Sequence, residues 1–137
     1  MSFLLDTNVV SELFRERANP NVMAWFGSVP STDLFLSVIT LGEIRKGIEL
    51  KRSSSAAQAD LLEAWLHALA LRYRSRTFAF DEEAADVWGR IMAAHPNLPV
   101  EDGQLAAIAL RHDLTLVTRN VRHVARTGVV HLDPFQG

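Results

Sequence analysis

The stretch that decides the fold is Phe3-Leu4-Leu5-Asp6-Thr7-Asn8-Val9-Val10, near the start of the chain. Three consecutive apolar residues are typical of a buried strand, and this run stops at an acid, Asp6. From Thr7 onward the apolar residues fall at helical spacing (Val9, Val10, Leu13 and Phe14). The stretch therefore predicts a strand over 3–5 that meets a polar turn and passes directly into a helix.

The same alternation of strand and helix recurs along the chain. Short apolar runs predict further strands at 34–38, 77–80, 114–118 and 129–132. Helical spacing of apolar residues predicts amphipathic helices around 22–29, 41–48, 62–73, 84–92 and 105–112. Strands that alternate with helices imply a mostly parallel sheet covered by helices on both faces. In such sheets polar chemistry gathers at the carboxyl ends of the strands.

Composition limits the class of protein. The 137 residues are 48% hydrophobic and 22% charged, which fits one globular domain and excludes a disordered, collagen-like or coiled-coil chain. The sequence has no cysteine, so disulfides, thiolate metal sites and cysteine nucleophiles are excluded. No apolar run approaches the ~20 residues of a membrane span, and no secretory signal is evident. We therefore expect a cytoplasmic protein without membrane association.

Three carboxylates stand where the predicted sheet could bring them together. Asp6 ends the first strand, Glu43 lies in an otherwise apolar helix, and Asp102 opens the helix that contains Leu105. Each has a purely structural interpretation as well. Asp6 can cap the following helix, Glu43 can lie on a solvated face, and Asp102 is favoured at a helix N-terminus by the helix dipole.

Taken together, the three acids predict a divalent cation. Clustered carboxylates repel one another, and desolvation raises their pKa values, so the cluster would be strained without a cation. Mg²⁺ takes oxygen ligands, keeps part of its water shell and binds phosphate oxygens. Carboxylates that hold such an ion serve metal-assisted hydrolysis of phosphodiesters. The net charge of −2 gives no global positive field, so a nucleic-acid partner has to be recognised by local residues.

Four blocks of the sequence resemble PIN-domain ribonucleases, and most closely the VapC/FitB-type toxins of bacterial toxin–antitoxin pairs. The likeness spans nearly the whole chain, with the blocks in the order and at the spacing usual in that family. They are Leu5-Asp6-Thr7-Asn8-Val9-Val10-Ser11-Glu12-Leu13, Ile39-Thr40-Leu41-Gly42-Glu43-Ile44, Asp102-Gly103-Gln104-Leu105-Ala106-Ala107 and Leu116-Val117-Thr118-Arg119-Asn120.

The resemblance implies a three-layer α/β sandwich with a central, mostly parallel sheet, and a single PIN domain over residues 1–137. It implies a Mg²⁺- or Mn²⁺-dependent endoribonuclease that hydrolyses RNA as the toxin of a toxin–antitoxin pair. By position, Asp6, Glu43 and Asp102 match the family's metal-binding acids. Thr118 would hydrogen-bond a carboxylate or a metal-bound water, unless it is merely a hydroxyl at a strand end. Asn8 and Asn120 fall in the first and last blocks, as candidates for substrate binding.

One position departs from the family pattern. Members commonly follow Thr-Arg-Asn with two residues and then Asp, whereas here Thr118-Arg119-Asn120-Val121-Arg122 is followed by His123. Histidine therefore occupies the position of the fourth acidic ligand, which a second complete metal site would need. His123 is either a ligand, which would suit Mn²⁺ better than Mg²⁺, or a surface residue.

The C-terminal part of the chain is locally basic. Arg119 and Arg122 flank the expected site and could hold RNA phosphates, although ordinary surface ion pairs are the alternative. The resemblance further implies an antitoxin whose C-terminal segment enters a groove near the early helices. It also implies self-association, as a homodimer or a larger toxin–antitoxin assembly, with operator DNA bound only through the antitoxin.

Two other functions are open to this sequence. A catalytically weak PIN-like module could act mainly by binding RNA or a protein partner, and the departure at His123 favours it. A phosphatase of the haloacid-dehalogenase kind could use Asp6 as its nucleophile. Such enzymes need Asp-x-Asp, and Asn8 stands where the second Asp would be, so we set this alternative aside.

Overall fold

The computed structural model describes residues 1–136 and has a five-stranded sheet in the order β3-β2-β1-β4-β5. Every pair of neighbouring strands is parallel, so the predicted parallel sheet is confirmed. The central strand pairs through Leu4 with Phe35 on one side and Leu116 on the other. The strands are β1 (Phe3–Leu5), β2 (Leu34–Ser37), β3 (Thr77–Phe78), β4 (Thr115–Val117) and β5 (His131–Leu132).

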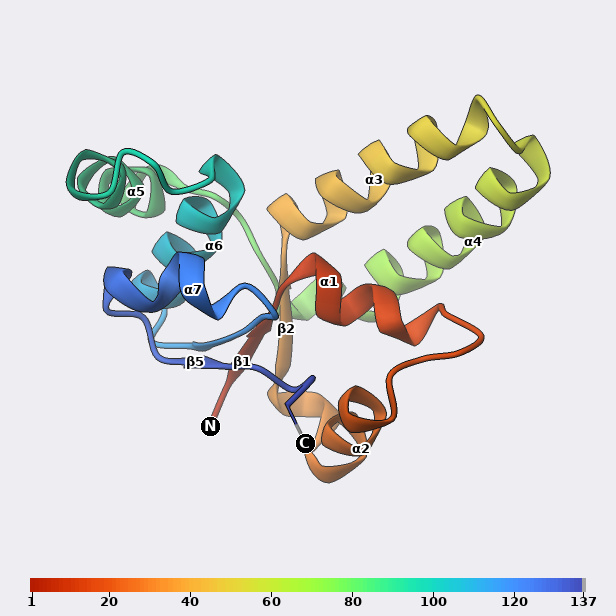
Figure 1. The fold of residues 1–137 in the computed structure, drawn as a ribbon, viewed down its shortest axis with the longest axis horizontal. Helices are drawn as coiled ribbons and strands as arrows, with labels where there is room; N and C mark the ends of the chain where they lie inside the picture. The colour runs from red at the N-terminus through yellow and green to blue at the C-terminus, as the bar shows by residue number, and fades with distance from the viewer. Residues whose placement is uncertain (137) are drawn as a thin grey trace.

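Helices cover both faces of the sheet, as the sequence predicted (Figure 1). One face carries α1 (Thr7–Val10), α2 (Pro20–Ser28), α3 (Val38–Arg52) and α4 (Ala56–Arg72). The other carries α5 (Glu82–Ala94), α6 (Val100–Arg111) and α7 (Val121–Val124). Short 3₁₀ turns join these elements: η1 (Ser11–Leu13), η2 (Ser31–Asp33), η3 (Arg74–Arg76) and η4 (Ala125–Thr127).

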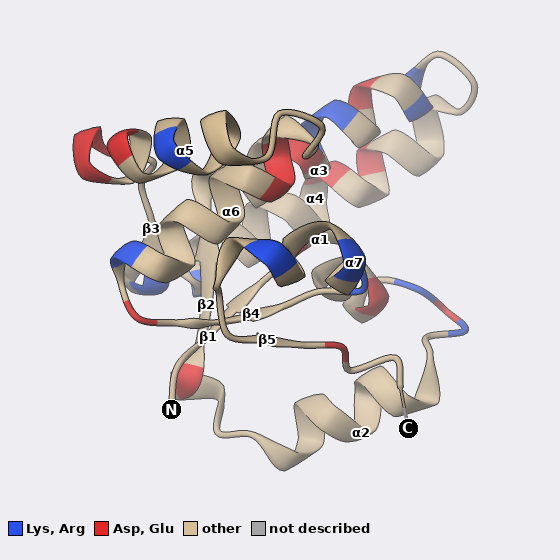
Figure 2. Ribbon diagram, turned by 60° about the vertical axis from the view of Figure 1, so that its left-hand side comes forward, with Lys and Arg blue, Asp and Glu red and all other residues tan. Residues whose placement is uncertain are grey.

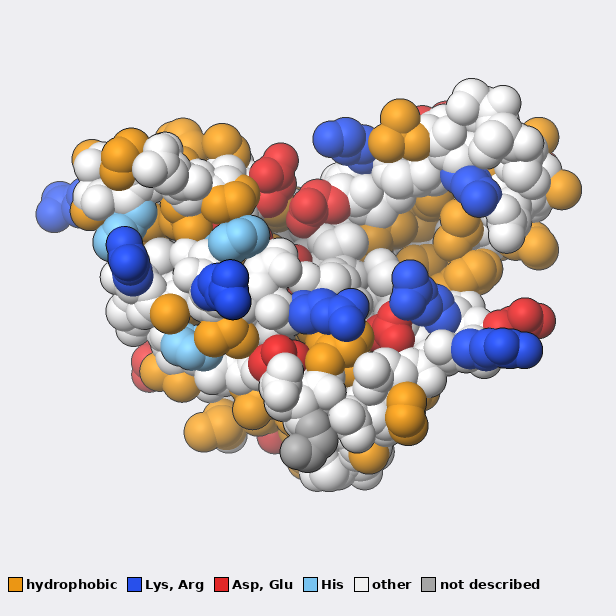
Figure 3. Space-filling model, viewed as in Figure 1, with side chains coloured by type: hydrophobic (Ala, Val, Ile, Leu, Met, Phe, Trp, Pro, Cys, Tyr) orange, Lys and Arg blue, Asp and Glu red, His pale blue; other side chains and the backbone are white. Residues whose placement is uncertain are grey.

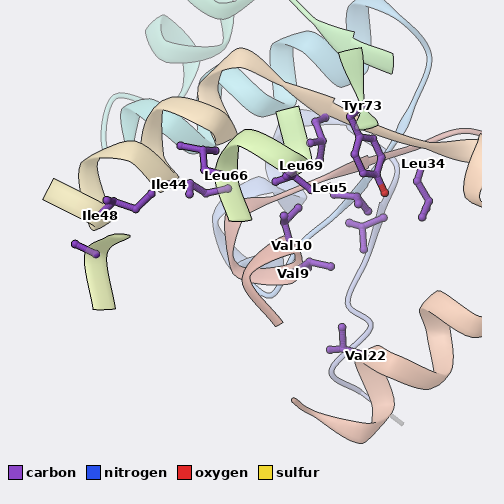
Figure 4. Packing of buried hydrophobic residues seen from close by; sticks show 13 residues of the cluster. Leu5, Val9, Val10, Val22, Leu34, Ile44, Ile48, Leu66, Leu69 and Tyr73 are labelled. Atoms are coloured by element: carbon purple, nitrogen blue, oxygen red, sulfur yellow. The ribbon is translucent and has the colours of Figure 1, made fainter. Parts of the chain in front are cut away.

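Two hydrophobic clusters, one on each side of the sheet, form the core. Successive strand residues point to opposite faces, so Leu5 joins the cluster with α1 to α4 (Figure 4), whereas Leu4 packs against α6. Both leucines are completely buried. Replacing a leucine of this kind with alanine typically costs about 2–5 kcal/mol of stability. The short β1 is therefore the point at which the three layers are joined.

The elements differ from the prediction mainly at their ends. The strand predicted over 34–38 stops at Ser37, because the Ser37 hydroxyl accepts a hydrogen bond from the Thr40 backbone N–H at 3.2 Å and caps α3. The helix predicted to run through Phe14 is wrong in extent. It tightens into the 3₁₀ turn η1, where Glu12 turns inward and accepts a hydrogen bond from the Asn19 backbone N–H at 2.8 Å.

Helices α3 and α4 form an arm that projects from the sheet (Figure 1), and residues of both charges lie along it (Figure 2). Arg52 of α3 contacts Asp60 and Glu63 of α4 at 2.9 and 2.5 Å. Arg45 contacts the same Glu63 at 3.1 Å. Isolated surface ion pairs contribute little, but a network fixes geometry. The network on the arm therefore fixes the position of α3, whose first half carries Glu43.

Within residues 1–136, no helix combines the length and the apolar character that crossing a bilayer requires.

Candidate active site

Asp6 follows the last residue of β1 and lies at the carboxyl edge of the sheet. Its Oδ1 accepts a hydrogen bond from the Thr7 backbone N–H at 2.6 Å, and so caps α1. Its Oδ2 accepts one from the Thr118 hydroxyl at 2.7 Å and a longer one from the Asn8 amide at 3.4 Å. The Asp6 side chain is therefore held by residues from two neighbouring strand ends. Only 5% of the residue is exposed.

Two further acids reach the same edge from different helices. Glu43 comes from α3, and its Oε1 accepts a hydrogen bond from the Thr7 hydroxyl at 2.8 Å. Asp102 lies in the first turn of α6 and is almost fully buried. The Asp102 carboxylate contacts Nδ1 of His123 at 2.6 Å.

The charges of the three acids act on one another. Burial raises the pKa of the Asp6 carboxyl, hydrogen bonds from Thr118 and Thr7 oppose that rise, and the negative charge of Asp102 adds to it. Burial likewise raises the pKa of Glu43 against the hydrogen bond from Thr7. The charges of Asp6, Glu101 and Asp102 raise it further. The fold thus gathers negative charge at this edge of the sheet.

The donor set fits a hard divalent ion that keeps part of its water shell. In the part of the chain that the structure describes, no three His, Asp or Glu side chains are arranged to coordinate one ion together. A closed protein cage of the kind that zinc prefers is therefore not formed there. Mg²⁺ instead is usually bound by one or two carboxylates, several waters and substrate phosphates. Two buried, mutually repelling aspartates match that pattern.

The remaining candidate residues line the same edge. The Asn120 backbone N–H donates to the Thr118 hydroxyl at 3.0 Å, and the Arg119 backbone N–H donates to the Asn8 side chain at 3.3 Å. The Arg119 guanidinium lies 4.4 Å from the centre of the Phe135 ring. The block around Thr118 is therefore tied to the block around Asp6.

His123 does not stand alone on the surface. Its side chain is 48% exposed, but Nδ1 is engaged by Asp102, which leaves only Nε2 free to meet an ion or a substrate. An imidazole in this position orients the carboxylate that it contacts. The structure thus provides a third arrangement, in which His123 supports Asp102 rather than replacing an acidic ligand.

Sequence reasoning missed two acids. Glu101 precedes Asp102 in the first turn of α6, and its charge acts on Glu43. Its place beside Asp102 was the available signal. Glu12 is 4% exposed, yet it fixes the loop to Asn19 and pairs with Arg15 at 3.2 Å, away from the other acids. No pattern in the sequence distinguishes Glu12 from a surface glutamate.

Two depressions flank the acids, and acidic side chains lie in the hollow between α6 and the α3–α4 arm (Figure 3). The first, of about 330 Å³, includes Thr7 and Glu43, and we call it the apolar groove for its walls (Phe14, Ile44, Ile48, Leu62 and Trp65). The second, of about 400 Å³, includes His123, and we call it the basic pocket (His95, Pro96, Leu98, Pro99, Arg122 and Arg126). The acids thus stand between an apolar and a cationic surface.

The order of strands, the acids at their carboxyl edge and the helices on both faces together define the class of protein. The family model of the PIN domain matches residues 3–129, and the chain therefore belongs to the PIN domain family.

Individual relatives resemble the chain over almost its full length. Toxin FitB of Neisseria gonorrhoeae is 32% identical over 136 residues, which cover 96% of this chain and 97% of FitB. VapC ribonuclease Y4jK of Sinorhizobium fredii is 29% identical, with 97% of both chains covered. A structure of FitAB bound to the IR36 DNA fragment contains a chain that is 30% identical and aligns with a TM-score of 0.87. That alignment covers 98% of this chain and 96% of the other.

Proposed function

We propose that this protein is a metal-dependent endoribonuclease, the toxin of a toxin–antitoxin pair, with Mg²⁺ or Mn²⁺ as its ion. The observation that carries the proposal is the convergence of Asp6, Glu43 and Asp102 on one edge of the sheet. There the charge of Asp102 raises the pKa of Asp6, and the charges of Asp6 and Asp102 raise the pKa of Glu43. Membership of the PIN domain family and relatives named as a toxin and as a ribonuclease support it.

In this proposal Asp6 and Asp102 hold the ion, and Glu43 completes the acidic cluster. The ion, when bound, supplies Lewis-acid activation of water and neutralises charge on the phosphate. The Thr118 and Thr7 hydrogen bonds fix the oxygens of Asp6 and Glu43 in place.

Positively charged and amide side chains would position the RNA. Arg119 and Arg122 would bind phosphate oxygens, and Asn8 and Asn120 would contact the strand at the same edge. We therefore assign these four residues to substrate binding. His123 would keep Asp102 oriented, so the departure from the family's Asp is compatible with one ion.

The partner that we propose is an antitoxin, with its C-terminal segment in the apolar groove. Thr7 and Glu43 line that groove, so a segment bound there would lie against one of the acids. The structure of FitAB bound to the IR36 DNA fragment supports an assembly that binds DNA. We propose that operator DNA is bound through the antitoxin, and that the toxin is a homodimer or part of a larger complex. Because the protein would meet both RNA and antitoxin in the cytoplasm, we propose that it is a cytoplasmic protein. We also propose that residues 1–137 form a single PIN domain.

The direct test of the activity uses purified protein and a mixed RNA pool. We expect cleavage with Mg²⁺ or Mn²⁺, none with EDTA, and none from an Asp102→Asn variant that keeps the wild-type fold by circular dichroism. Binding of RNA without cleavage under every metal condition would favour the catalytically weak module instead. Cleavage that persists in EDTA would contradict the proposal.

A further inference from the structure

The basic pocket combines a cationic side with an apolar wall. It lies between the end of α5, the 95–99 loop and α7. Arg122 and Arg126 contribute guanidinium groups, and Pro96, Leu98 and Pro99 contribute apolar surface. A volume of about 400 Å³ falls within the range of roughly 300–1,000 Å³ that is typical of ligand clefts.

Two connections join the basic pocket to the acidic cluster. Pro99 is the N-cap residue of α6, and its carbonyl accepts a hydrogen bond from the Gly103 backbone N–H at 3.1 Å. Asp102 lies between these two residues in the chain. His123 lines the pocket and contacts Asp102 at 2.6 Å. A ligand in the pocket therefore lies directly beside the proposed ion site.

The two arginines of the basic pocket form no salt bridge within the described part of the chain. Among residues 1–136, no carboxylate lies within salt-bridge distance of Arg122 or Arg126, whereas Arg45 and Arg52 on the α3–α4 arm are both paired. Figure 3 shows basic and histidine side chains gathered over α7 and its surroundings. Unpaired guanidinium groups at one rim match phosphate oxygens, which they can bind bidentately.

We propose that the basic pocket binds the nucleotide next to the scissile phosphate of a single-stranded RNA. Arg122 and Arg126 hold its phosphate, and its base lies against the wall formed by Pro96, Leu98 and Pro99. The inference rests on the proposed ribonuclease function and adds to it a pocket that takes one nucleotide beside the acids. A base within a duplex is stacked and paired and cannot enter such a pocket, whereas an unpaired base can.

The test measures RNA binding in an Asp6→Asn background, so that cleavage does not interfere. The probes are a fluorescent single-stranded RNA oligonucleotide of mixed sequence and its duplex, titrated in Mg²⁺ buffer at several salt concentrations. For a single strand, each neutralised phosphate contributes about 0.7 to the slope of log affinity against log salt. We expect Arg126→Gln to lower that slope by about 0.7 for the single strand and to leave duplex binding unchanged. Arg74→Gln, an exposed arginine beside the opposite edge strand β3, is the matched control and should change neither.

The possible results of this test distinguish a failure of the pocket proposal from a failure of the proposed ribonuclease function. An unchanged slope for Arg126→Gln, in a chain whose wild type cleaves RNA, would overturn the pocket's role and leave the ribonuclease standing. An equal effect on single-stranded and duplex probes would overturn the preference for an unpaired nucleotide. A lowered single-strand slope in a chain that never cleaves RNA would support the pocket and contradict the nuclease.

Discussion

At the scale of single residues, Asp6 performs a structural task without losing its availability for chemistry. Its Oδ1 caps α1 through the Thr7 backbone N–H, and its Oδ2 accepts the Thr118 hydroxyl. An ionised carboxylate has about four acceptor sites, two on each oxygen, so Oδ1 keeps a lone pair for an ion, and on Oδ2 only the long 3.4 Å contact from Asn8 would compete with one. The capping interpretation and the ligand interpretation of this aspartate are therefore compatible.

Thr118 is the residue that positions Asp6. Thr118→Val removes the hydroxyl and leaves Oδ2 with only the 3.4 Å contact from Asn8. We expect metal affinity to fall by about 10- to 100-fold, as for other groups that orient a ligand. Thr118→Ser keeps the hydroxyl and should restore most of the affinity. Equal Mn²⁺ affinity in wild type and both variants, measured by calorimetry, would show that this hydrogen bond plays no part.

The raised pKa of Asp6 predicts how stability depends on pH. Because the native carboxyl binds its proton more tightly than the unfolded one, the free energy of unfolding of the metal-free protein should rise as pH falls toward the native pKa. Asp6→Asn, which cannot ionise, should be more stable than wild type at pH 7, and the difference should shrink as pH falls.

Chemical denaturation of both proteins in EDTA across that pH range measures the effect. Mn²⁺ at pH 7 should stabilise wild type and leave Asp6→Asn nearly unchanged, because the ion replaces the proton as the neutralising charge. A variant less stable than wild type at every pH would contradict the sign of the pKa shift.

At the scale of secondary structure elements, close packing of α5 on α6 sets the position of Asp102. A Cβ on Gly103 would lie 2.7 Å from the sulfur of Met92, so that side chain would have to shift, and 3.3 Å from the Trp88 indole, which is a tight contact. The indole Nε1 of Trp88 is buried and has no hydrogen-bond partner within the described part of the chain. Gly103 is thus needed for its lack of a side chain, one residue away from a candidate ligand.

Gly103→Ala should therefore destabilise the protein, by about 1–3 kcal/mol, and reduce cleavage by displacing Asp102. Gly89→Ala is the matched control, because Gly89 lies within α5 and a Cβ there meets nothing within 4 Å. That control should stabilise the protein by about 0.8–1 kcal/mol. Urea denaturation measures both, and a Gly103→Ala protein as stable as wild type would refute the close approach.

Much of this arrangement could be predicted from the sequence, since apolar runs and helical spacing are local signals. The strand at Phe3–Leu5 and the helix around 84–92 are local features of that kind, and both are present. The contact between Thr7 and Glu43 joins residues 36 positions apart, and that between Asp102 and His123 joins residues 21 apart. Such contacts depend on how α3, α6 and α7 pack on the sheet, which no local pattern specifies.

At the scale of the whole molecule, the apolar groove lies beside the acids and offers a surface for the proposed antitoxin. Phe14 is 39% exposed, and its ring centre lies 5.3 Å from that of Trp65 across the groove. Phe14→Ser should weaken the antitoxin complex and leave RNA cleavage by the free protein unchanged.

Leu71→Ser is the matched control, because Leu71 is exposed on α4 but does not line the groove. Co-expression with the cognate antitoxin should rescue growth for wild type and Leu71→Ser, and rescue should be weaker for Phe14→Ser. A stable complex that still cleaves RNA would contradict inhibition at this surface.

The central claim is that Asp6, which follows β1, and Asp102 of α6 hold one ion, with the charge of Glu43 from α3 beside them. Titration of Mn²⁺ into the metal-free protein by calorimetry tests it most directly, with Asp6→Asn, Glu43→Gln and Asp102→Asn measured alongside wild type. We predict one saturable binding event in wild type, and its loss or a large weakening in each of the three variants, all of which keep the wild-type circular dichroism spectrum. Wild-type affinity in any of the aspartate variants, or no binding by wild type, would contradict the account.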